Sequence, residues 1–217
     1  MRVLVTGGTG YLGRPLIHAL VARGHAVRAV VRAASACRLA DGAEAVVADP
    51  LEAGSYSAAG CEAFVHLIGV SHPSPWKAEQ FQAVDVRSVE VAVRAAREAA
   101  ISHFIYLSVA HPAPVMRAYI AARERCEQMV CEAGLNATLV RPWYVLGPGH
   151  RWPYILKPIY RLLESVPSKR AAALRLGLVT REQMIAALVA AAEHPASGVR
   201  VLEVPEIRKA ALAAGHS

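Results

Sequence analysis

The first twenty residues of the chain, MRVLVTGGTGYLGRPLIHAL (1–20), contain the stretch that decides the fold. The apolar run 3–5 has the character of a buried β-strand, and it breaks into a group of closely spaced glycines. A helix is expected directly afterwards, over 11–23, because Gly24 is a typical helix stop. A strand, a glycine-rich turn and a helix in this order predict a phosphate-binding unit.

Two spacings fit the glycines of this loop. Gly8, Gly10 and Gly13 follow the G-x-G-x-x-G pattern, whereas Gly7, Gly10 and Gly13 recur every three residues. One glycine takes a positive φ at the tight turn, a second lets the backbone approach a pyrophosphate, and a third lets the helix pack closely on the strand. The N–H groups and dipole at the start of the helix attract phosphate. The expected members of this dinucleotide site are Thr6, Gly7, Gly8, Thr9, Gly10, Tyr11, Leu12 and Gly13.

The length and composition favour one α/β domain. The chain has 217 residues, of which 54% are hydrophobic, so it buries a core but has little room for a separate substrate domain of ordinary size. We expect a single dinucleotide-binding domain over 1–217. Its nucleotide-binding core is 1–150, and the short extension 151–217 completes the sheet and covers the cleft.

Charge, cysteines and hydropathy narrow the class of protein. The net charge is +7, but Lys and Arg are dispersed without interleaved aromatic residues, which argues against nucleic acid as a partner. The four cysteines form no C-x-x-C pair, so neither a metal site nor a disulfide framework is expected. No run has the length of a membrane-spanning helix, and the N-terminus lacks a signal-peptide pattern. We therefore expect a soluble cytoplasmic protein.

Strand and helix patterns alternate along the rest of the chain. Alternation of this kind predicts a doubly wound parallel β-sheet, the Rossmann architecture, with helices on both faces. His66 falls inside one strand and is expected in the core. The expected strands are 26–31, 45–48, 63–68, 103–108, 137–140, 174–179 and 199–204, and the expected helices are 79–100, 115–133, 152–163 and 181–193.

Residues at the carboxyl ends of these strands are candidates for cofactor contacts, because ligands of open parallel sheets bind beyond those ends. Arg32 occupies the position of the acid that would bind the ribose of NAD, so NADP is favoured over NAD; the alternative is a solvated arginine at a strand end. Asp49, with Pro50, is a candidate adenine contact or a turn-initiating Asp before Pro. Leu67 and Gly69 lie where a small residue lets a nucleotide pass close to the backbone.

Ser108, Tyr119 and Arg123 form the candidate catalytic group. Ser108 ends a strand, and Tyr119 and Arg123 are four residues apart on the next helix, so they share a face. If this face lies at the cofactor cleft, the Tyr119 hydroxyl acts as general acid or base, Ser108 orients a carbonyl, and Arg123 stabilises the phenolate. The spacing alone favours the alternative, a structural tyrosine beside a solvated arginine.

Four motifs together resemble the extended and atypical short-chain dehydrogenases/reductases, including nitrogen-regulator-like proteins and an accessory subunit of respiratory complex I. The motifs are Thr6-Gly-Gly-Thr-Gly-Tyr-Leu-Gly13, Tyr106-Leu-Ser108, Tyr119-x-x-x-Arg123 and Leu139-Val-Arg-Pro142. The similarity covers 1–150, with a weaker match beyond. It implies a Rossmann fold that binds NAD(P) and a Ser-Tyr-Lys group that moves a proton while the cofactor moves hydride.

Two positions depart from the family pattern. Arg123 stands where the family has a lysine, and Asp85 most nearly matches its asparagine. Arginine keeps the positive charge but is a poor proton relay. The resemblance therefore implies an NADPH-dependent oxidoreductase or epimerase-like enzyme acting on a small carbonyl or hydroxyl compound. The alternative is a catalytically weak or inactive dinucleotide-binding sensor or scaffold acting through protein contacts.

Three loops and two surfaces complete the expectations. Substrate selection is expected in loops 70–78, 110–118 and 143–153. The resemblance suggests a homodimer in which helices 79–100 and 115–133 pair with their copies. The aromatic and apolar segment 152–163 is a candidate contact with a protein or a membrane surface, although such a stripe more often packs on its own domain.

Overall fold

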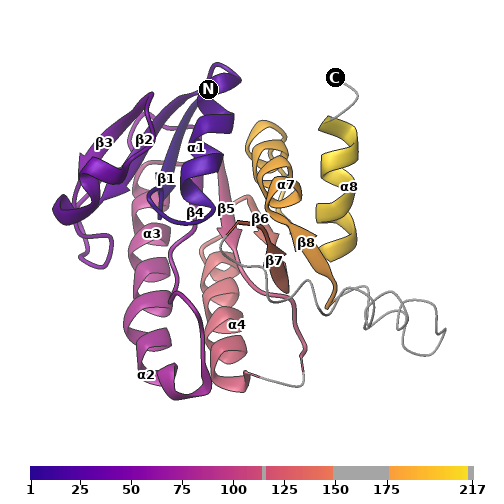
Figure 1. The fold of residues 1–217 in the computed structure, drawn as a ribbon. Helices are drawn as coiled ribbons and strands as arrows, with labels where there is room; N and C mark the ends of the chain where they lie inside the picture. Colours follow the sequence, from indigo (N-terminus) through magenta and orange to yellow (C-terminus); the bar gives the residue numbers. More distant parts are fainter. Residues whose placement is uncertain (114–115, 149–175, 215–217) are drawn as a thin grey trace.

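The computed structural model describes residues 1–113, 116–148 and 176–214. Its main sheet has seven strands in the order β3-β2-β1-β4-β5-β6-β9, each parallel to its neighbours (Figure 1). The order reverses between β1 and β4, and this switch point lies beside the glycine loop. The predicted doubly wound parallel sheet is confirmed. The strands are β1 (Arg2–Thr6), β2 (Ala26–Val31), β3 (Ala43–Val47), β4 (Ala63–His66), β5 (His103–Leu107), β6 (Ala137–Val140) and β9 (Val199–Leu202).

Helices cover both faces of this sheet (Figure 1). One face carries α1 (Gly13–Ala22) and α7 (Arg181–Glu193), with α8 (Val204–Ala214) packed against α7, and the other carries α3 (Arg87–Glu98) and α4 (Arg117–Glu132). None of the helices in the described ranges has the length and apolar character needed to cross a membrane. The short turns are η1 (Ala33–Arg38), η2 (Pro75–Lys77), α2 (Ala78–Gln80) and the π-helical η3 (Phe81–Val86).

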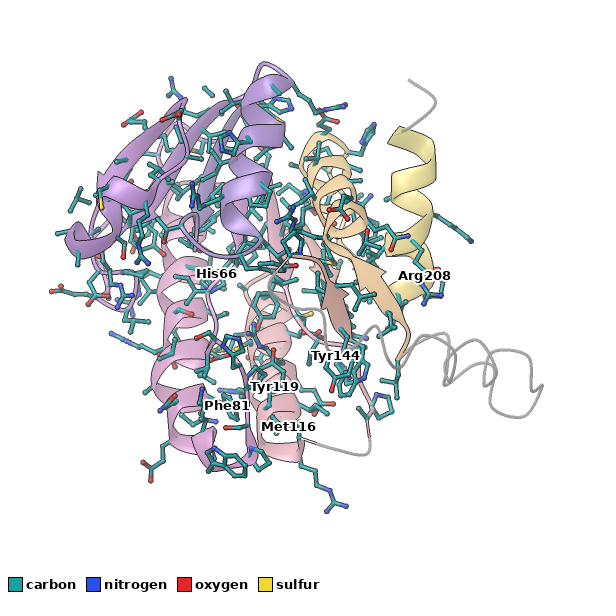
Figure 2. All side chains as sticks on the ribbon, in the orientation of Figure 1. His66, Phe81, Met116, Tyr119, Tyr144 and Arg208 are labelled. Atoms are coloured by element: carbon teal, nitrogen blue, oxygen red, sulfur yellow. The ribbon has the colours of Figure 1, made fainter. Side chains whose placement is uncertain are left out.

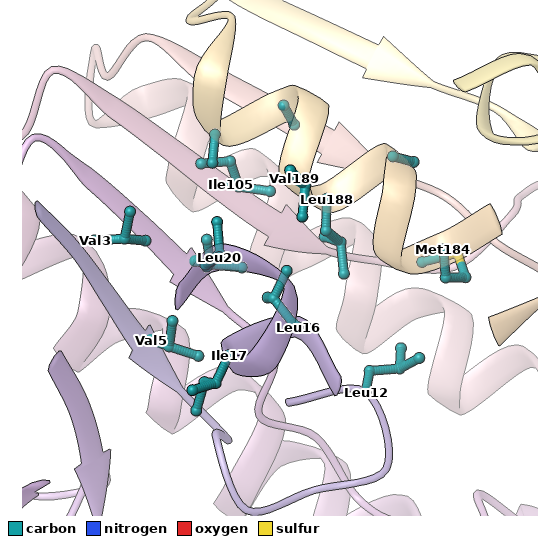
Figure 3. Packing of buried hydrophobic residues seen from close by; sticks show 14 of the residues in the cluster. Val3, Val5, Leu12, Leu16, Ile17, Leu20, Ile105, Met184, Leu188 and Val189 are labelled. Atoms are coloured by element: carbon teal, nitrogen blue, oxygen red, sulfur yellow. The ribbon is translucent and has the colours of Figure 1, made fainter. Parts of the chain in front are cut away.

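Alternating side chains of the strands divide the core into two clusters. Val3 and Val5 of β1 point to the face covered by α1 and α7, where Leu16 and Leu188 pack (Figure 3). Leu4, between the two valines, points to the face covered by α3 and α4. Because the strands are buried on both faces, they appear in the sequence as continuous apolar runs. This packing fixes the carboxyl ends of the strands, where the candidate site lies.

The expected helix 79–100 is present as an unbroken helical run over 78–98, but it is not a regular α-helix throughout. A π-helical segment at Phe81–Val86 lies between α2 and α3, and it carries Asp85, which is fully buried. Such turns are rare and often lie at functional sites. Apolar periodicity alone does not distinguish this turn from a regular α-helix.

Near the C-terminal end the structure contains one strand that the sequence pattern did not predict. β7 (Tyr144–Leu146) occupies the segment expected to be a rigid loop. It pairs in parallel, in a separate small sheet, with β8 (Leu178–Thr180), which overlaps the end of the expected strand 174–179. The expected strand 199–204 ends at Leu202, and α8 begins at Val204. The short strands β7 and β8 exist through pairing across the fold, which a local pattern does not contain. The expected helix 152–163 lies outside the described residues.

Candidate active site

The glycine loop turns sharply at Gly7, which has a φ of +75°, a backbone conformation that favours glycine. A Cβ at Gly7 would lie 3.0 Å from the carbonyl carbon of Leu67, so the loop rests directly on the end of β4. The Gly10 amide donates to the Gly7 carbonyl over 3.0 Å and closes the turn. Leu67, a candidate cofactor contact, therefore lies directly beside the glycine loop.

At Gly13 the start of α1 packs more closely on the backbone of the loop than at any other glycine of the loop. A Cβ there would lie 2.1 Å from the Gly7 carbonyl oxygen, and α1 begins at this residue. Gly8 instead packs towards the core, since its Cβ would lie 2.9 Å from Ile17 Cδ1. Gly7 thus makes the tight turn and Gly13 the close packing of α1 on the loop, which favours the spacing of Gly7, Gly10 and Gly13. The approach of a pyrophosphate at Gly10 stays a prediction. The expected helix 11–23 starts two residues later because residues up to Leu12 belong to the turn.

The residues expected at the adenosine end of the cofactor lie at the carboxyl ends of β2 and β3. Arg32 directly follows β2 and is exposed, and Arg38 of η1 donates to the Ser35 hydroxyl over 2.8 Å. The carboxylate of Asp49 accepts the Leu51 amide over 2.9 Å, which is the local turn that Asp49 and Pro50 predict. Exposed Asp49 therefore has a structural role at this edge of the sheet.

A cavity of about 450 Å³ joins the glycine loop to the candidate catalytic residues. It receives side chains from all three loops expected to select substrate: His72 and Pro73, then Met116, then Trp143 to Val145. Figure 2 shows Tyr119 of α4 and Met116, which directly precedes α4, with Tyr144 of β7 facing them. The described lining residues are Tyr11, Leu12, His72, Pro73, Leu107, Ser108, Val109, Met116, Tyr119, Arg123, Pro142, Trp143, Tyr144 and Val145.

Backbone strain is concentrated at this cavity. His72 and Met116 line it and have φ values of 52° and 59°, in the left-handed region that residues with a Cβ seldom adopt. Strained conformations of this kind cluster at functional sites. Gly147, which the sequence reading did not single out, also shapes the wall, because a Cβ there would lie 2.2 Å from the Tyr11 hydroxyl.

Arg123 is buried, not solvated as in the alternative reading of the sequence. Its guanidinium lies 2.8 Å from the Asp85 carboxylate, and Nη1 donates to the Tyr106 hydroxyl over 3.1 Å and to the Leu107 carbonyl over 2.9 Å. The Arg123 side chain is 6% exposed and that of Asp85 is 0% exposed. Burial raises the pKa of Asp85, and the charge of Arg123 opposes this shift.

Tyr119 is half-buried, and Figure 2 shows it near Phe81. Its ring centroid is 5.2 Å from that of Phe81, and the Arg123 guanidinium carbon lies 5.2 Å from the same centroid. The expected pairing of Tyr119 and Arg123 on one helix face is therefore present at the cavity. A cation this close to the ring interacts favourably with its π face.

Ser108 lies at the carboxyl end of β5, is 4% exposed and lines the same cavity. Behind it, Glu127 of α4 is held by Arg141, and its carboxylate is 3.3 Å from His111 Nε2. Burial alone would raise the pKa of Glu127, but its hydrogen bonds with His111 and Arg141 lower it to about 2. Sequence reading missed this carboxylate, because Glu127 has the position of an ordinary helix residue in the sequence.

His66 is fully buried in β4, as expected. The Ser88 hydroxyl donates to the Asp85 carbonyl over 3.0 Å, so its oxygen accepts from His66 Nε2, 3.2 Å away, and His66 Nδ1 accepts from the Thr6 hydroxyl over 2.8 Å. Burial, aided by the charge of Arg123, lowers the pKa of His66 to about 3. His66 is therefore neutral, and it links the end of β1 to the turn that holds Asp85. Within the described ranges, no group of three His, Cys, Asp or Glu side chains has a geometry that holds a metal ion.

Comparisons with known proteins agree with this geometry. The profile of a family described as NAD(P)H-binding matches residues 7–195. A ketoreductase of Stigmatella aurantiaca acting on 4-hydroxy-2-methyl-3-oxo-4-farnesyl-3,4-dihydroquinoline-1-oxide is 33% identical over 174 residues, which are 68% of this chain and 51% of the relative. A 3-diazoavenalumate denitrifying reductase of a Streptomyces species is 30% identical over 227 residues, covering 91% of this chain and 74% of the relative. The chain thus spans about half the length of the first relative and about three quarters of the second.

Among solved structures, a short-chain dehydrogenase/reductase superfamily protein from Agrobacterium tumefaciens with bound NAD has a TM-score of 0.68 at 20% identity. The match covers 94% of this chain and 77% of that protein, and it establishes the fold. Both sequence relatives are named as reductases, and neither is named as a sensor or scaffold. The glycine loop and the profile match over residues 7–195 show that the chain belongs to the NAD(P)H-binding family. Its fold is that of the short-chain dehydrogenase/reductase superfamily.

Proposed function

We propose that the protein is an NADPH-dependent reductase that converts a carbonyl group of a small, largely apolar compound into an alcohol. The observation that carries this proposal is the cavity of about 450 Å³ in which Tyr11 of the glycine loop meets Ser108, Tyr119 and Arg123. Gly7 and Gly13 let the loop turn sharply and pack closely on the end of β4 and the start of α1, which fits a glycine loop that holds a pyrophosphate at the β1/β4 switch point. An epimerase-like reaction uses the same groups but needs a sugar hydroxyl as its substrate.

In the proposed reaction, the hydride for the carbonyl carbon would come from NADPH bound at the glycine loop. Tyr119 donates its phenolic proton to the carbonyl oxygen, so that the C=O bond becomes an alcohol and Tyr119 becomes a phenolate. Ser108 lies at the same cavity and orients the oxygen, and the Arg123 guanidinium, 5.2 Å from the Tyr119 ring, stabilises the phenolate. Because arginine does not give up its proton in this pH range, we expect Tyr119 to recover its proton from water in the cavity.

The walls of the cavity favour an apolar substrate. Trp143 and Tyr144 form an edge-on pair with centroids 5.4 Å apart, and Arg123 is the one permanently charged side chain among the described lining residues. Its charge is already paired with Asp85. A ring compound with a ketone fits this surface better than a sugar nucleotide, whose phosphates need unpaired cations. The Stigmatella relative is named for a farnesylated quinoline, a compound of the first kind.

The activity is tested by following NADPH oxidation with a panel of aromatic and aliphatic ketones. We expect Tyr119→Phe to reduce turnover by on the order of 10²-fold or more, the contribution typical of a general acid. Tyr56→Phe is the matched control, since it removes a hydroxyl from a buried tyrosine that does not line the cavity. Equal turnover in Tyr119→Phe and the wild type would overturn the catalytic assignment.

The preference for NADP rests on Arg32, because its exposed cationic side chain follows β2 where an acid would favour NAD. We expect calorimetry to show tighter binding of NADPH than of NADH, and Arg32→Ala to remove most of the difference. Arg97→Ala, on the far side of the sheet in α3, is the control. If the wild type binds both cofactors equally, the NADP assignment fails while the reductase assignment stands.

Two expectations about the cellular context extend the proposal. A cytoplasmic location is supported by the cysteines, which are free in the described residues. The proposed homodimer would form through α3 and α4, whose surfaces carry Glu90, Arg94 and Glu132 around a shallow groove. In a two-fold dimer, the acidic side chains of one copy would pair with the basic side chains of the other. Sedimentation or light scattering at low and high salt tests the dimer, and a monomer at both would contradict it. The contact expected through 152–163 lies outside the described residues.

A further inference from the structure

The two positions at which this chain departs from the family pattern contact each other. Asp85, on the π-helical turn η3, and Arg123, on α4, stand where the resemblance expects an asparagine and a lysine, and their side chains lie 2.8 Å apart. Both side chains are buried, and of the two only Arg123 lines the cavity, where its guanidinium carbon is 5.2 Å from the Tyr119 ring centroid. The two departures therefore form one ion pair, in which each residue compensates for the charge of the other.

The backbone is fitted to this pair. The Val70 amide donates to the Asp85 carboxylate over 3.0 Å. A Cβ at Gly69 would lie 2.0 Å from Arg123 Nη2 and 3.2 Å from Asp85 Oδ1, so only glycine leaves room for the guanidinium. The Tyr106 hydroxyl and the Leu107 carbonyl accept hydrogen bonds from Nη1, and Nη2 pairs with Asp85. These three contacts fix the position of the guanidinium.

We propose that Asp85 is a positioning residue that holds the Arg123 guanidinium beside Tyr119 and offsets its charge, so that Asp85 and Arg123 set the pH range of the Tyr119 proton transfer together. This inference rests on the proposed reductase function. Asp85 does not reach the cavity lining, and it acts on the reaction through Arg123. Gly69 belongs to the same arrangement because it makes space for the pair.

The sign of the effect follows from the charges around Tyr119. Arg123 contacts the Tyr119 ring from α4, and Asp85 of η3 and Tyr106 of β5 contact Arg123 in turn. The other titratable groups of the cavity lining are His72, Tyr11 and Tyr144. With Asp85 ionised, the pair is close to neutral. Neutralising Asp85 leaves the positive charge of Arg123 uncompensated about 5 Å from the ring, so the Tyr119 phenolate forms more easily.

The test compares Asp85→Asn, Arg123→Lys and the double variant with the wild type. We expect the pH profile of kcat/KM in Asp85→Asn to move to lower pH, by on the order of one unit. We expect Arg123→Lys alone to lose activity at least tenfold, because one ammonium cannot replace the contacts with Asp85, Tyr106 and Leu107. The double variant, which restores the family pattern, should regain most of that activity. Glu90→Gln, an exposed carboxylate on α3 paired with Arg87, is the matched control and should change neither profile.

A second readout does not need turnover. The near-ultraviolet absorbance of the Tyr119 phenolate, taken as the difference between each protein and its Tyr119→Phe version, should appear at lower pH in Asp85→Asn. If Asp85→Asn does not fold, the same comparison between Arg123→Lys and the double variant replaces it, with the double variant forming phenolate at lower pH. Unchanged pH dependence in both readouts, with only a lower melting temperature, would overturn the proposal. Absence of ketone reduction by the wild type would overturn the proposed function instead, and the absorbance measurement would still test the pair.

Discussion

The Gly13→Ala substitution tests whether the loop geometry defines the cofactor site. A Cβ at Gly13 would lie 2.1 Å from the Gly7 carbonyl oxygen and 2.7 Å and 2.8 Å from Gly8 Cα and C. All three are backbone atoms, which cannot rotate away as a flexible side chain would. The start of α1 must therefore move away from the loop by about 1 Å, or the loop must open by a similar distance.

Two effects of opposite sign compete in this variant. Alanine is the better helix former by up to about 1 kcal/mol, and Gly13 is the first residue of α1. Forcing an extra methyl group into a packed site typically costs about 1–3 kcal/mol. Since the contact is with rigid backbone, we expect the cost to prevail, with a net loss of about 1–2 kcal/mol in the free energy of unfolding. For a chain of this size that lowers the melting temperature by about 2–8 °C.

The same movement disturbs the cradle for the pyrophosphate. We expect calorimetry to show at least a tenfold weaker affinity for NADPH, which corresponds to about 1.4 kcal/mol. Gly24→Ala is the control: Gly24 has a φ of +81° and nothing within 4 Å of the added Cβ, so it should lose stability without losing NADPH affinity. A Gly13→Ala protein that is as stable as the wild type and binds NADPH equally well would refute the reasoning.

Three further predictions concern the cavity wall, the buried carboxylate and the core. Gly69→Ala should displace the Arg123 guanidinium and reduce ketone turnover by tenfold or more in a folded protein, as checked by circular dichroism. The pKa of Glu127 falls from 4.5 to about 2 on folding, so its ionised form stabilises the protein above about pH 4.5, and this contribution is lost as pH falls through about 2. Glu127→Gln should therefore be less stable than wild type in urea at pH 7, by up to about 3 kcal/mol, with a difference that shrinks towards pH 2; a constant difference would contradict the assignment. Leu188 of α7 is fully buried in the core cluster beside the sheet, so Leu188→Ala should lower the free energy of unfolding by about 2–5 kcal/mol. The affinity for NADPH, measured by calorimetry at a temperature where the variant is fully folded, should not change.

Much of the fold could be predicted because its signals are local. The apolar run 3–5, the glycines and the helix pattern that follows determine the β1-loop-α1 unit, since positive φ and close backbone approach are properties of glycine itself. Alternation of buried strands and amphipathic helices then determines a parallel, doubly wound sheet. Placing Tyr119 and Arg123 on one face needed only the helical repeat.

The tertiary structure alone decided how the distant side chains meet. Asp85 and Arg123 are on different elements, and their pairing depends on the π-turn and on the space left by Gly69. The Glu127 and Arg141 pair and the β7 and β8 strands likewise depend on contacts across the fold. Sequence spacing determines the local backbone and the exposed or buried face of each element. It does not contain the distances between elements, and those distances decide which buried charges compensate one another and which groups share the cavity.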